Sequence, residues 1–306
     1  MNHSASRRNF LINSASIASA ATLAPRTLFA ASPLANVRYG YTAMTWSKEE
    51  KQAIEDISAL GFPGIQFRID AVTEFKPAEL RDTLAQHKLA FVALSSGEVN
   101  IDPAVEADEI AKHVANAKFV HDSGGLYLQV LDALKPYPRS VTPEECKRLG
   151  QLLTKIGKQT ADLGVSLGYH NHMNTISENP ANLDIVLESS DPKYVKLELD
   201  TAHSYAGGGD PAKAIEKYHD RLLFLHLKDA VEIPLGSENS KYPFKFVELG
   251  RGKVDLPAVF AALNKVKYSG WAVVELDRVP DKSHTPKECA QISRDYLEKQ
   301  TGAKFA

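Results

Sequence analysis

The chain has 306 residues, and its 36 lysines and arginines nearly balance its 38 aspartates and glutamates, for a formal net charge of -2. This balance leaves no basic excess to coat a nucleic-acid backbone, so we expect no nucleic-acid partner. Hydrophobic residues make up 43% of the chain and charged residues 24%, an ordinary globular composition that excludes a disordered protein.

The N-terminal segment carries an export pattern. Residues 6–11 read SRRNFL, an alanine- and serine-rich, mildly apolar run follows, and small residues at 30–32 offer a cleavage site. The pattern is similar to a twin-arginine signal peptide. The run is too short and too polar to span a bilayer core of about 30 Å. We therefore expect residues 1–32 to direct export to the periplasm and residues 33–306 to form a mature domain without membrane insertion. The alternative is a simple N-terminal arm.

From residue 37 onward, short apolar runs of strand length alternate with longer stretches of helical spacing. The predicted strands are Val37–Thr45, Gly64–Ile69, Ala90–Ser95, Gly125–Leu131, Val165–His172, Tyr194–Asp200, Leu222–Lys228 and Trp271–Asp277. The predicted helices are Lys48–Leu60, Pro77–His87, Pro103–Asp122, Pro143–Leu163, Pro180–Ser189, Pro211–His219, Leu256–Lys267 and Pro286–Gln300. Eight βα units in about 250 residues predict a (β/α)8 TIM barrel in a single domain.

The distribution of polar residues supports a closed barrel. An open, doubly wound sheet is the alternative, but polar residues recur at the carboxyl ends of strands across the whole chain. The segment 230–254 follows the seventh strand and is rich in Gly, Pro, Ser and Lys. We expect it to form a loop over the mouth of the barrel.

Four consecutive predicted strands end in ionisable side chains. These are His170 and His172 after strand five, Asp200 and His203 after strand six, His226 and Lys228 after strand seven, and Glu275 after strand eight. An unpaired buried charge costs several kcal/mol, and a shared divalent cation removes that cost. Imidazoles and carboxylates without a thiolate suit Mn, Co, Fe(II) or Zn. The sequence therefore predicts one metal ion at this end of the barrel.

Spacing suggests individual roles. His170 and His172 are two residues apart on one strand face, so one could hold the metal while the other moves protons. His203 lies on the turn after Asp200, where it could bond a substrate hydroxyl or donate a proton. Lys228 is either a site residue or a solvated lysine at the barrel rim. Glu198 needs a buried partner, for which Lys196 and Lys228 are the candidates.

These residues resemble the xylose isomerase-like barrel family of sugar phosphate isomerases and epimerases, and most of all its inosose-dehydratase branch. The resemblance rests on the strand-end motifs YHNHM at 169–173, DTAH at 200–203, HLKD at 226–229 and GWAVVE at 270–275. It implies one divalent metal, with manganese favoured, held by His170, Asp200, His226 and Glu275. Trp46 falls where that branch carries a tryptophan near the substrate. His170 stands where the epimerases have a glutamate, and this difference favours elimination.

We expect an enzyme that abstracts a proton next to a carbonyl of a sugar or cyclic polyol. Glu275, His170 or His172 is the expected base, and His203 or Lys228 the expected acid. The enzyme would be a lyase, either a dehydratase or a keto-glycoside lyase. The alternatives are a sugar isomerase or epimerase on the same metal site and an exported sugar-binding barrel without catalysis. The sequence is compatible with a homo-oligomer and does not decide the oligomeric state.

Overall fold

The structure is a computed structural model that describes residue 34 and residues 36–132, 140–237 and 242–306. The predicted signal segment, residues 1–32, lies outside the described residues. Among the helices that are described, none is long and apolar enough to cross a membrane.

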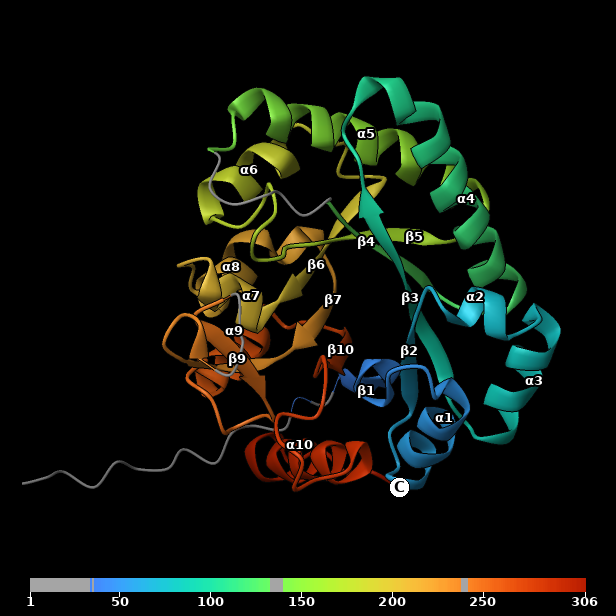
Figure 1. Cartoon of the computed structure of the whole chain (residues 1–306), viewed down its shortest axis with the longest axis vertical. Helices are drawn as coiled ribbons and strands as arrows, with labels where there is room; N and C mark the ends of the chain where they lie inside the picture. Colours follow the sequence, from blue (N-terminus) through green and yellow to red (C-terminus); the bar gives the residue numbers. More distant parts are fainter. Residues whose placement is uncertain (1–33, 35, 133–139, 238–241) are drawn as a thin grey trace, which may run out of the picture. The chain divides into compact units, whose positions relative to one another are not determined.

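Eight parallel strands close into a barrel in the order β1-β10-β7-β6-β5-β4-β3-β2 (Figure 1). β1 pairs with both β10 and β2, so the sheet has no free edge. The strands are β1 (Val37–Thr42), β2 (Gly64–Arg68), β3 (Ala90–Val99), β4 (Tyr127–Asp132), β5 (Ser166–His170), β6 (Val195–Asp200), β7 (Leu222–Leu227) and β10 (Gly270–Val274). The prediction of a (β/α)8 TIM barrel in a single domain is confirmed.

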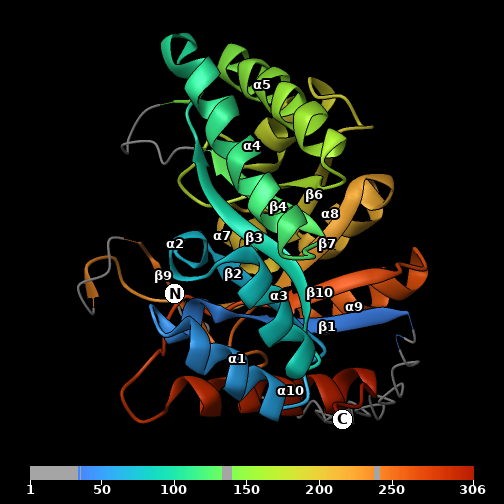
Figure 2. The same ribbon diagram turned by 90° about the vertical axis from the view of Figure 1, so that its right-hand side faces the viewer.

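Helices connect the strands, and neighbouring ones such as α4 and α5 lie side by side (Figure 2). The α-helices are α1 (Glu50–Ala59), α2 (Ala71–Glu74), α3 (Pro77–Gln86), α4 (Glu106–Asp122), α5 (Pro143–Asp162), α6 (Pro180–Glu188), α7 (Thr201–Ala206), α8 (Pro211–Tyr218), α9 (Leu256–Lys265) and α10 (Pro286–Thr301), and the 3-10 helices are η1 (Ala43–Trp46), η2 (Pro103–Val105) and η3 (His219–Arg221). Local chemistry fixes several helix starts. Thr142 and Thr285 form capping boxes before the first-turn prolines of α5 and α10.

The segment 230–254 differs from the predicted loop. Two strands, β8 (Asp229–Glu232) and β9 (Phe244–Val247), pair antiparallel in a second small sheet. The buried carboxylate of Asp229 holds the end of this insertion, because it accepts hydrogen bonds from the backbone N–H groups of Gly250, Gly252 and Val254 at 3.0, 2.9 and 3.1 Å. A side chain that satisfies several loop N–H groups replaces the sheet partners that the loop lacks.

Five strands end earlier than predicted, at Thr42, Arg68, His170, Leu227 and Val274. At β5 the reason is visible, since the carbonyl of His172 accepts a hydrogen bond from Thr175 Oγ1 at 2.6 Å and the chain turns there. His172 therefore lies in the loop after β5, and the expectation that it shares a strand with His170 is wrong.

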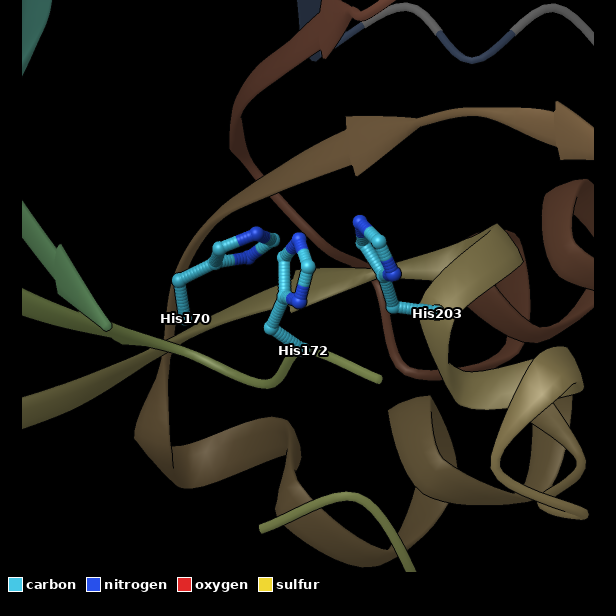
Figure 3. A group of neighbouring side chains, drawn as sticks. All are labelled: His170, His172 and His203. Atoms are coloured by element: carbon cyan, nitrogen blue, oxygen red, sulfur yellow. The ribbon is translucent and has the colours of Figure 1, made fainter. Parts of the chain in front are cut away.

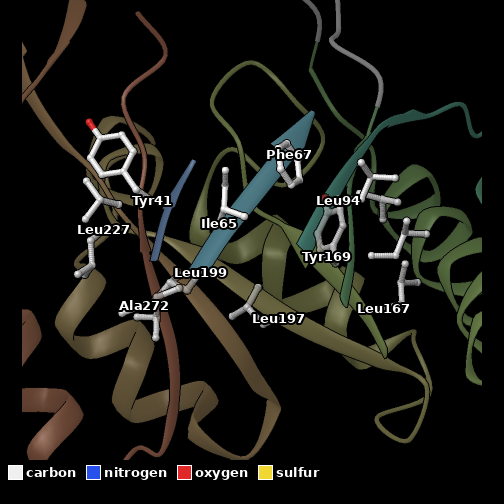
Figure 4. Close-up of a cluster of buried hydrophobic side chains, with 14 of the residues drawn as sticks. Tyr41, Ile65, Phe67, Leu94, Leu167, Tyr169, Leu197, Leu199, Leu227 and Ala272 are labelled. Carbon is white, nitrogen blue, oxygen red and sulfur yellow. The ribbon is translucent and has the colours of Figure 1, made fainter. Parts of the chain in front are cut away.

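Buried apolar side chains form two clusters. The larger cluster includes Ile65, Leu167 and Leu199 (Figure 4). The smaller one includes Phe224 of β7 and Trp271 of β10, which lie opposite each other on adjacent strands. Gly64 on β2 makes room for the indole, because a Cβ there would lie 2.5 Å from the Trp271 ring. Phe224 precedes His226 by two residues on the same face, so this apolar cluster forms a floor beneath the polar strand ends.

Candidate metal centre

The predicted metal ligands meet at the carboxyl ends of adjacent strands. His170 is the last residue of β5 and lies opposite Glu198 of β6, while Asp200 is the last residue of β6 and lies opposite His226 of β7. Glu275 follows the last residue of β10. Because parallel strands in a barrel end at one mouth, the register alone brings these side chains together.

Three carboxylates surround one edge of the His226 ring. Its Nδ1 lies 3.1 Å from Glu198 Oε1, 3.7 Å from Asp200 Oδ2 and in direct contact with Glu275 Oε2. His170 Nδ1 lies 2.9 Å from Glu198 Oε2. All five residues are at most 4% exposed. Burial opposes a charged imidazole, but Glu198 and Glu275 raise the pKa of His226 well above its ordinary value.

The residues fit a divalent cation. Within the described part of the chain, the buried atoms without a hydrogen-bond partner include both His Nδ1 atoms, both oxygens of Glu198, Asp200 Oδ2 and Glu275 Oε2. Ligand atoms of His170, Asp200 and His226 lie within 4.8 Å of one another. Buried carboxylates that face one another repel, and a cation among them removes that repulsion.

Glu198 is a residue whose role the sequence prediction missed. We expected Lys196 or Lys228 as its partner, but the structure pairs it with His170 and His226 instead. The signal was present, since Glu198 precedes Asp200 by two residues and therefore points to the same face of β6. The polar cluster thus contains a third carboxylate beyond Asp200 and Glu275.

A second group of three histidines, His170, His172 and His203, also places its nitrogen atoms within 4.8 Å of one another (Figure 3). Two of these rings already have partners. His172 Nδ1 donates to the carbonyl of Met173 at 2.6 Å, and His203 Nε2 accepts from Lys228 Nζ at 3.2 Å. The carboxylate-rich cluster is therefore the better candidate metal centre.

Lys228 is buried, at 1% exposed, so the alternative of a solvated rim lysine is wrong. Its Nζ lies 2.5 Å from Asp277 Oδ1 and 3.4 Å from Glu275 Oε1, and it sits 4.0 Å from the centre of the Phe246 ring of β9. Burial alone would lower the pKa of Lys228, but Asp277 and Glu275 raise it above its ordinary value. Lys228 is thus a charged ammonium group beside the metal centre.

Trp46 lies in η1 and is largely buried. Its indole N–H donates to Asp56 Oδ2 at 2.9 Å, and its ring packs edge-on against Tyr41. These contacts fix the orientation of the indole. A substrate contact by Trp46 stays a prediction.

A closed parallel barrel with histidines and carboxylates gathered at its carboxyl mouth defines a TIM-barrel protein with a metal-type site. The sequence profile of the xylose isomerase-like TIM barrel family matches residues 54–300, and the chain belongs to this family.

Inosose dehydratases from two bacteria match most of the chain. The inosose dehydratase of Geobacillus kaustophilus is 25% identical over 292 residues, which cover 86% of this chain and 94% of the relative. The inosose dehydratase of Salmonella typhimurium is 26% identical over 294 residues, which cover 86% of this chain and 96% of the relative. The expectation of an enzyme of the lyase or the sugar isomerase and epimerase kind is confirmed.

Solved structures share the fold. The IOLI protein with a binding zinc atom has a TM-score of 0.74 at 18% identity and covers 87% of this chain and 98% of its own. L-ribulose 3-epimerase has a TM-score of 0.69 at 16% identity, with coverage of 87% and 95%. At these identities the likeness shows the barrel architecture alone.

Proposed function

We propose that this protein is a divalent-metal-dependent carbon–oxygen lyase that acts beside a carbonyl group of a sugar or cyclic polyol. One observation carries the proposal: buried histidine and carboxylate atoms that have no hydrogen-bond partner among the described residues converge next to the charged Lys228. The inosose dehydratases that match most of the chain support a dehydration, and their substrates are small molecules of this class.

His170, Asp200, His226 and Glu275 would hold the cation, with Glu198 between the two histidines. Bound there, the cation would supply a Lewis acid for the substrate carbonyl and a neighbouring hydroxyl. The nitrogen and oxygen ligands are compatible with Mn, Co, Fe(II) or Zn. We favour manganese because, with Glu198 included, three carboxylates accompany two imidazoles.

His172 is the side chain best placed to act as the base. Its Nδ1 faces the Met173 carbonyl, which only accepts, so the proton resides on Nδ1 and Nε2 keeps a lone pair. Burial, followed by the nearby His170, lowers the pKa of His172 to about 3, which keeps the ring neutral. Burial alone would raise the pKa of Glu275, but His226 and Lys228 hold it well below its ordinary value. Glu275 would also serve as a ligand of the cation, which leaves it less available as a base.

Lys228 and His203 form the acid side of the site. The Lys228 ammonium donates to His203 Nε2, so Lys228 can pass a proton to a departing oxygen while His203 holds the ammonium in place. The α C–H bond breaks as His172 takes the proton, a carbon–carbon double bond forms, and the C–O bond on the next carbon breaks. The oxygen leaves as water from a hydroxyl substrate, or as the alcohol of a second sugar from a keto-glycoside.

A second candidate function is a sugar isomerase or epimerase on the same site, in which the proton returns to carbon. A third, from another class, is a sugar-binding barrel without turnover. His170 favours elimination, because it places an imidazole where a second carboxylate base would be needed for the two-carboxylate epimerisation.

We also propose that the chain is exported through the twin-arginine pathway, on the strength of SRRNFL at residues 6–11 and the apolar run behind it. Export favours a keto-glycoside substrate, since extracellular glycosides are more accessible there than cytoplasmic metabolites. Cell fractionation of the full chain and of an Arg7→Lys, Arg8→Lys variant tests this. Equal periplasmic amounts of the two proteins would contradict it.

The function itself is tested first by metal analysis. Purified mature protein, Asp200→Ala and the exposed control Asp220→Ala are compared by mass spectrometry for transition metals. We expect near one equivalent in the first and third proteins and a loss in the second. If none of the three proteins holds a metal after reconstitution, the result would favour a sugar-binding barrel without turnover.

A panel of inososes, keto-sugars and keto-glycosides in deuterated water then separates the reactions. Release of water or an alcohol, with an unsaturated product, is the result expected of a lyase. Deuterium at carbon with the skeleton intact would indicate an isomerase or epimerase. Tight binding without turnover would favour the binding barrel.

A further inference from the structure

A buried glutamine on β2 contacts the imidazole of His226. Gln66 is 2% exposed, and its Oε1 lies 2.9 Å from His226 Nε2. In the barrel order, β1 and β10 separate β2 from β7, so this contact crosses the interior. The contact joins Nε2 of His226, the ring nitrogen that does not face the carboxylates, to a strand three places away around the barrel.

We propose that Gln66 is a positioning residue that holds His226 with its proton on Nε2 and its Nδ1 directed at the metal centre. An amide oxygen accepts hydrogen bonds and cannot donate them, so the ring nitrogen beside it must carry the hydrogen. The lone pair of the neutral ring then resides on Nδ1. That atom is the one that faces Glu198, Asp200 and Glu275.

The neighbours of the His226 ring explain why this contact matters. The ring of Phe224 lies 5.8 Å from the ring of His226, and it belongs to the apolar floor of the barrel. An aromatic ring offers no carbonyl or carboxylate acceptor, so without Gln66 a buried N–H would lose its partner. The imidazole would then gain from flipping, which takes Nδ1 away from the centre.

A neutral amide suits this position better than a carboxylate. Glu198, Asp200 and Glu275 already place three carboxylates around Nδ1. A fourth carboxylate at residue 66 would accept the same hydrogen bond but add a buried negative charge. Gln66 orients the His226 ring without adding a buried charge. Outer contacts of this kind typically change metal affinity about 10- to 100-fold when removed.

The inference rests on the proposed metal centre, and it is tested with the mature protein and three variants. Gln66→Met keeps the side-chain volume and removes the hydrogen-bond acceptor, whereas Gln66→Glu keeps an acceptor. Gln129→Met is the control. It removes a second buried glutamine, on β4, whose Oε1 has no hydrogen-bond partner among the described residues. Zinc and manganese affinities are measured by competition with a chromophoric chelator. The His226 ring in the zinc-loaded proteins is followed by long-range ¹H–¹⁵N NMR.

We expect Gln66→Met to weaken metal binding about 10- to 100-fold and to lose the single Nε2–H signature of His226. We expect Gln66→Glu to keep that signature and Gln129→Met to bind as the parent does. If Gln66→Met does not fold, Gln66→Asn gives the same comparison, because the shorter side chain withdraws its oxygen from Nε2. Equal affinity and an unchanged signature in Gln66→Met would overturn the inference alone. A parent protein that binds no metal would overturn the proposed function, and this inference with it.

Discussion

Replacing Asp132 by asparagine should flatten the pH dependence of stability. The Asp132 carboxyl is fully buried at the end of β4, where it accepts hydrogen bonds from Tyr169 Oη and from the backbone N–H of Ile176, both at 2.6 Å. It therefore ties the loop that carries His172 to the barrel. Burial raises the pKa of Asp132 from 3.8 to about 6, against the lowering effect of these hydrogen bonds.

Proton linkage gives the direction and the size of this pH dependence of stability. The folded state binds the Asp132 proton more tightly than the unfolded state, so the stabilisation is complete below the unfolded pKa of 3.8 and is lost as the pH rises through about 6. A shift of this size corresponds to about 3 kcal/mol, of which about 2 kcal/mol disappears between about pH 4 and pH 7. The neutral amide of Asp132→Asn has no such dependence. Its NH2 group faces a donor, which lowers stability by an amount that does not vary with pH.

Urea unfolding at several pH values measures this difference. We expect the free energy of unfolding of the parent, relative to Asp132→Asn, to fall by about 2 kcal/mol from about pH 4 to pH 7. Asp82→Asn on α3 is the control, because its carboxylate is 70% exposed. A constant difference between the parent and Asp132→Asn across this range would refute the reasoning.

Three further results are expected. Gly64→Ala should destabilise the fold by about 1–3 kcal/mol in urea, because its Cβ would lie 2.5 Å from Trp271; unchanged stability would mean that the barrel floor adapts. Burial lowers the pKa of His113 from 6.5 to about 4, so its contribution to stability is complete above pH 6.5 and is lost as the pH falls towards 4. His113→Gln should reduce this acid-side loss by up to about 3 kcal/mol, and an equal loss in both proteins would count against it. Lys228→Met should lower kcat at least about 100-fold in a turnover assay with metal bound, whereas near-normal turnover would exclude Lys228 as the acid.

Much of this architecture could be predicted because it depends on short-range chemistry. The βα alternation follows from apolar periodicity, and the starts of α5 and α10 follow from threonine caps and prolines that act within one helical turn. His170, Asp200, His226 and Glu275 could be proposed together because parallel strands in a barrel deliver their carboxyl ends to one mouth.

The features that the sequence predicted wrongly depend on longer-range contacts. The end of β5 depends on the turn that Thr175 makes with His172, and the small sheet β8–β9 depends on the Asp229 carboxylate reaching residues more than twenty positions away. The composition of segment 230–254 predicted a loop, because its glycine, proline and serine residues do not favour strands. Strand pairing that is stabilised by a distant side chain leaves no trace in composition.

By itself, therefore, the sequence determined the kind of barrel, the mouth that carries the chemistry and the ionisable residues available there. Only the tertiary structure decided which of them face one another. It placed Glu198 between His170 and His226, buried Lys228 between Glu275 and Asp277, and brought Gln66 to His226 across the barrel. The physical reason is that strand periodicity fixes the face on which a side chain lies, whereas its partner across the interior depends on the register and closure of all eight strands.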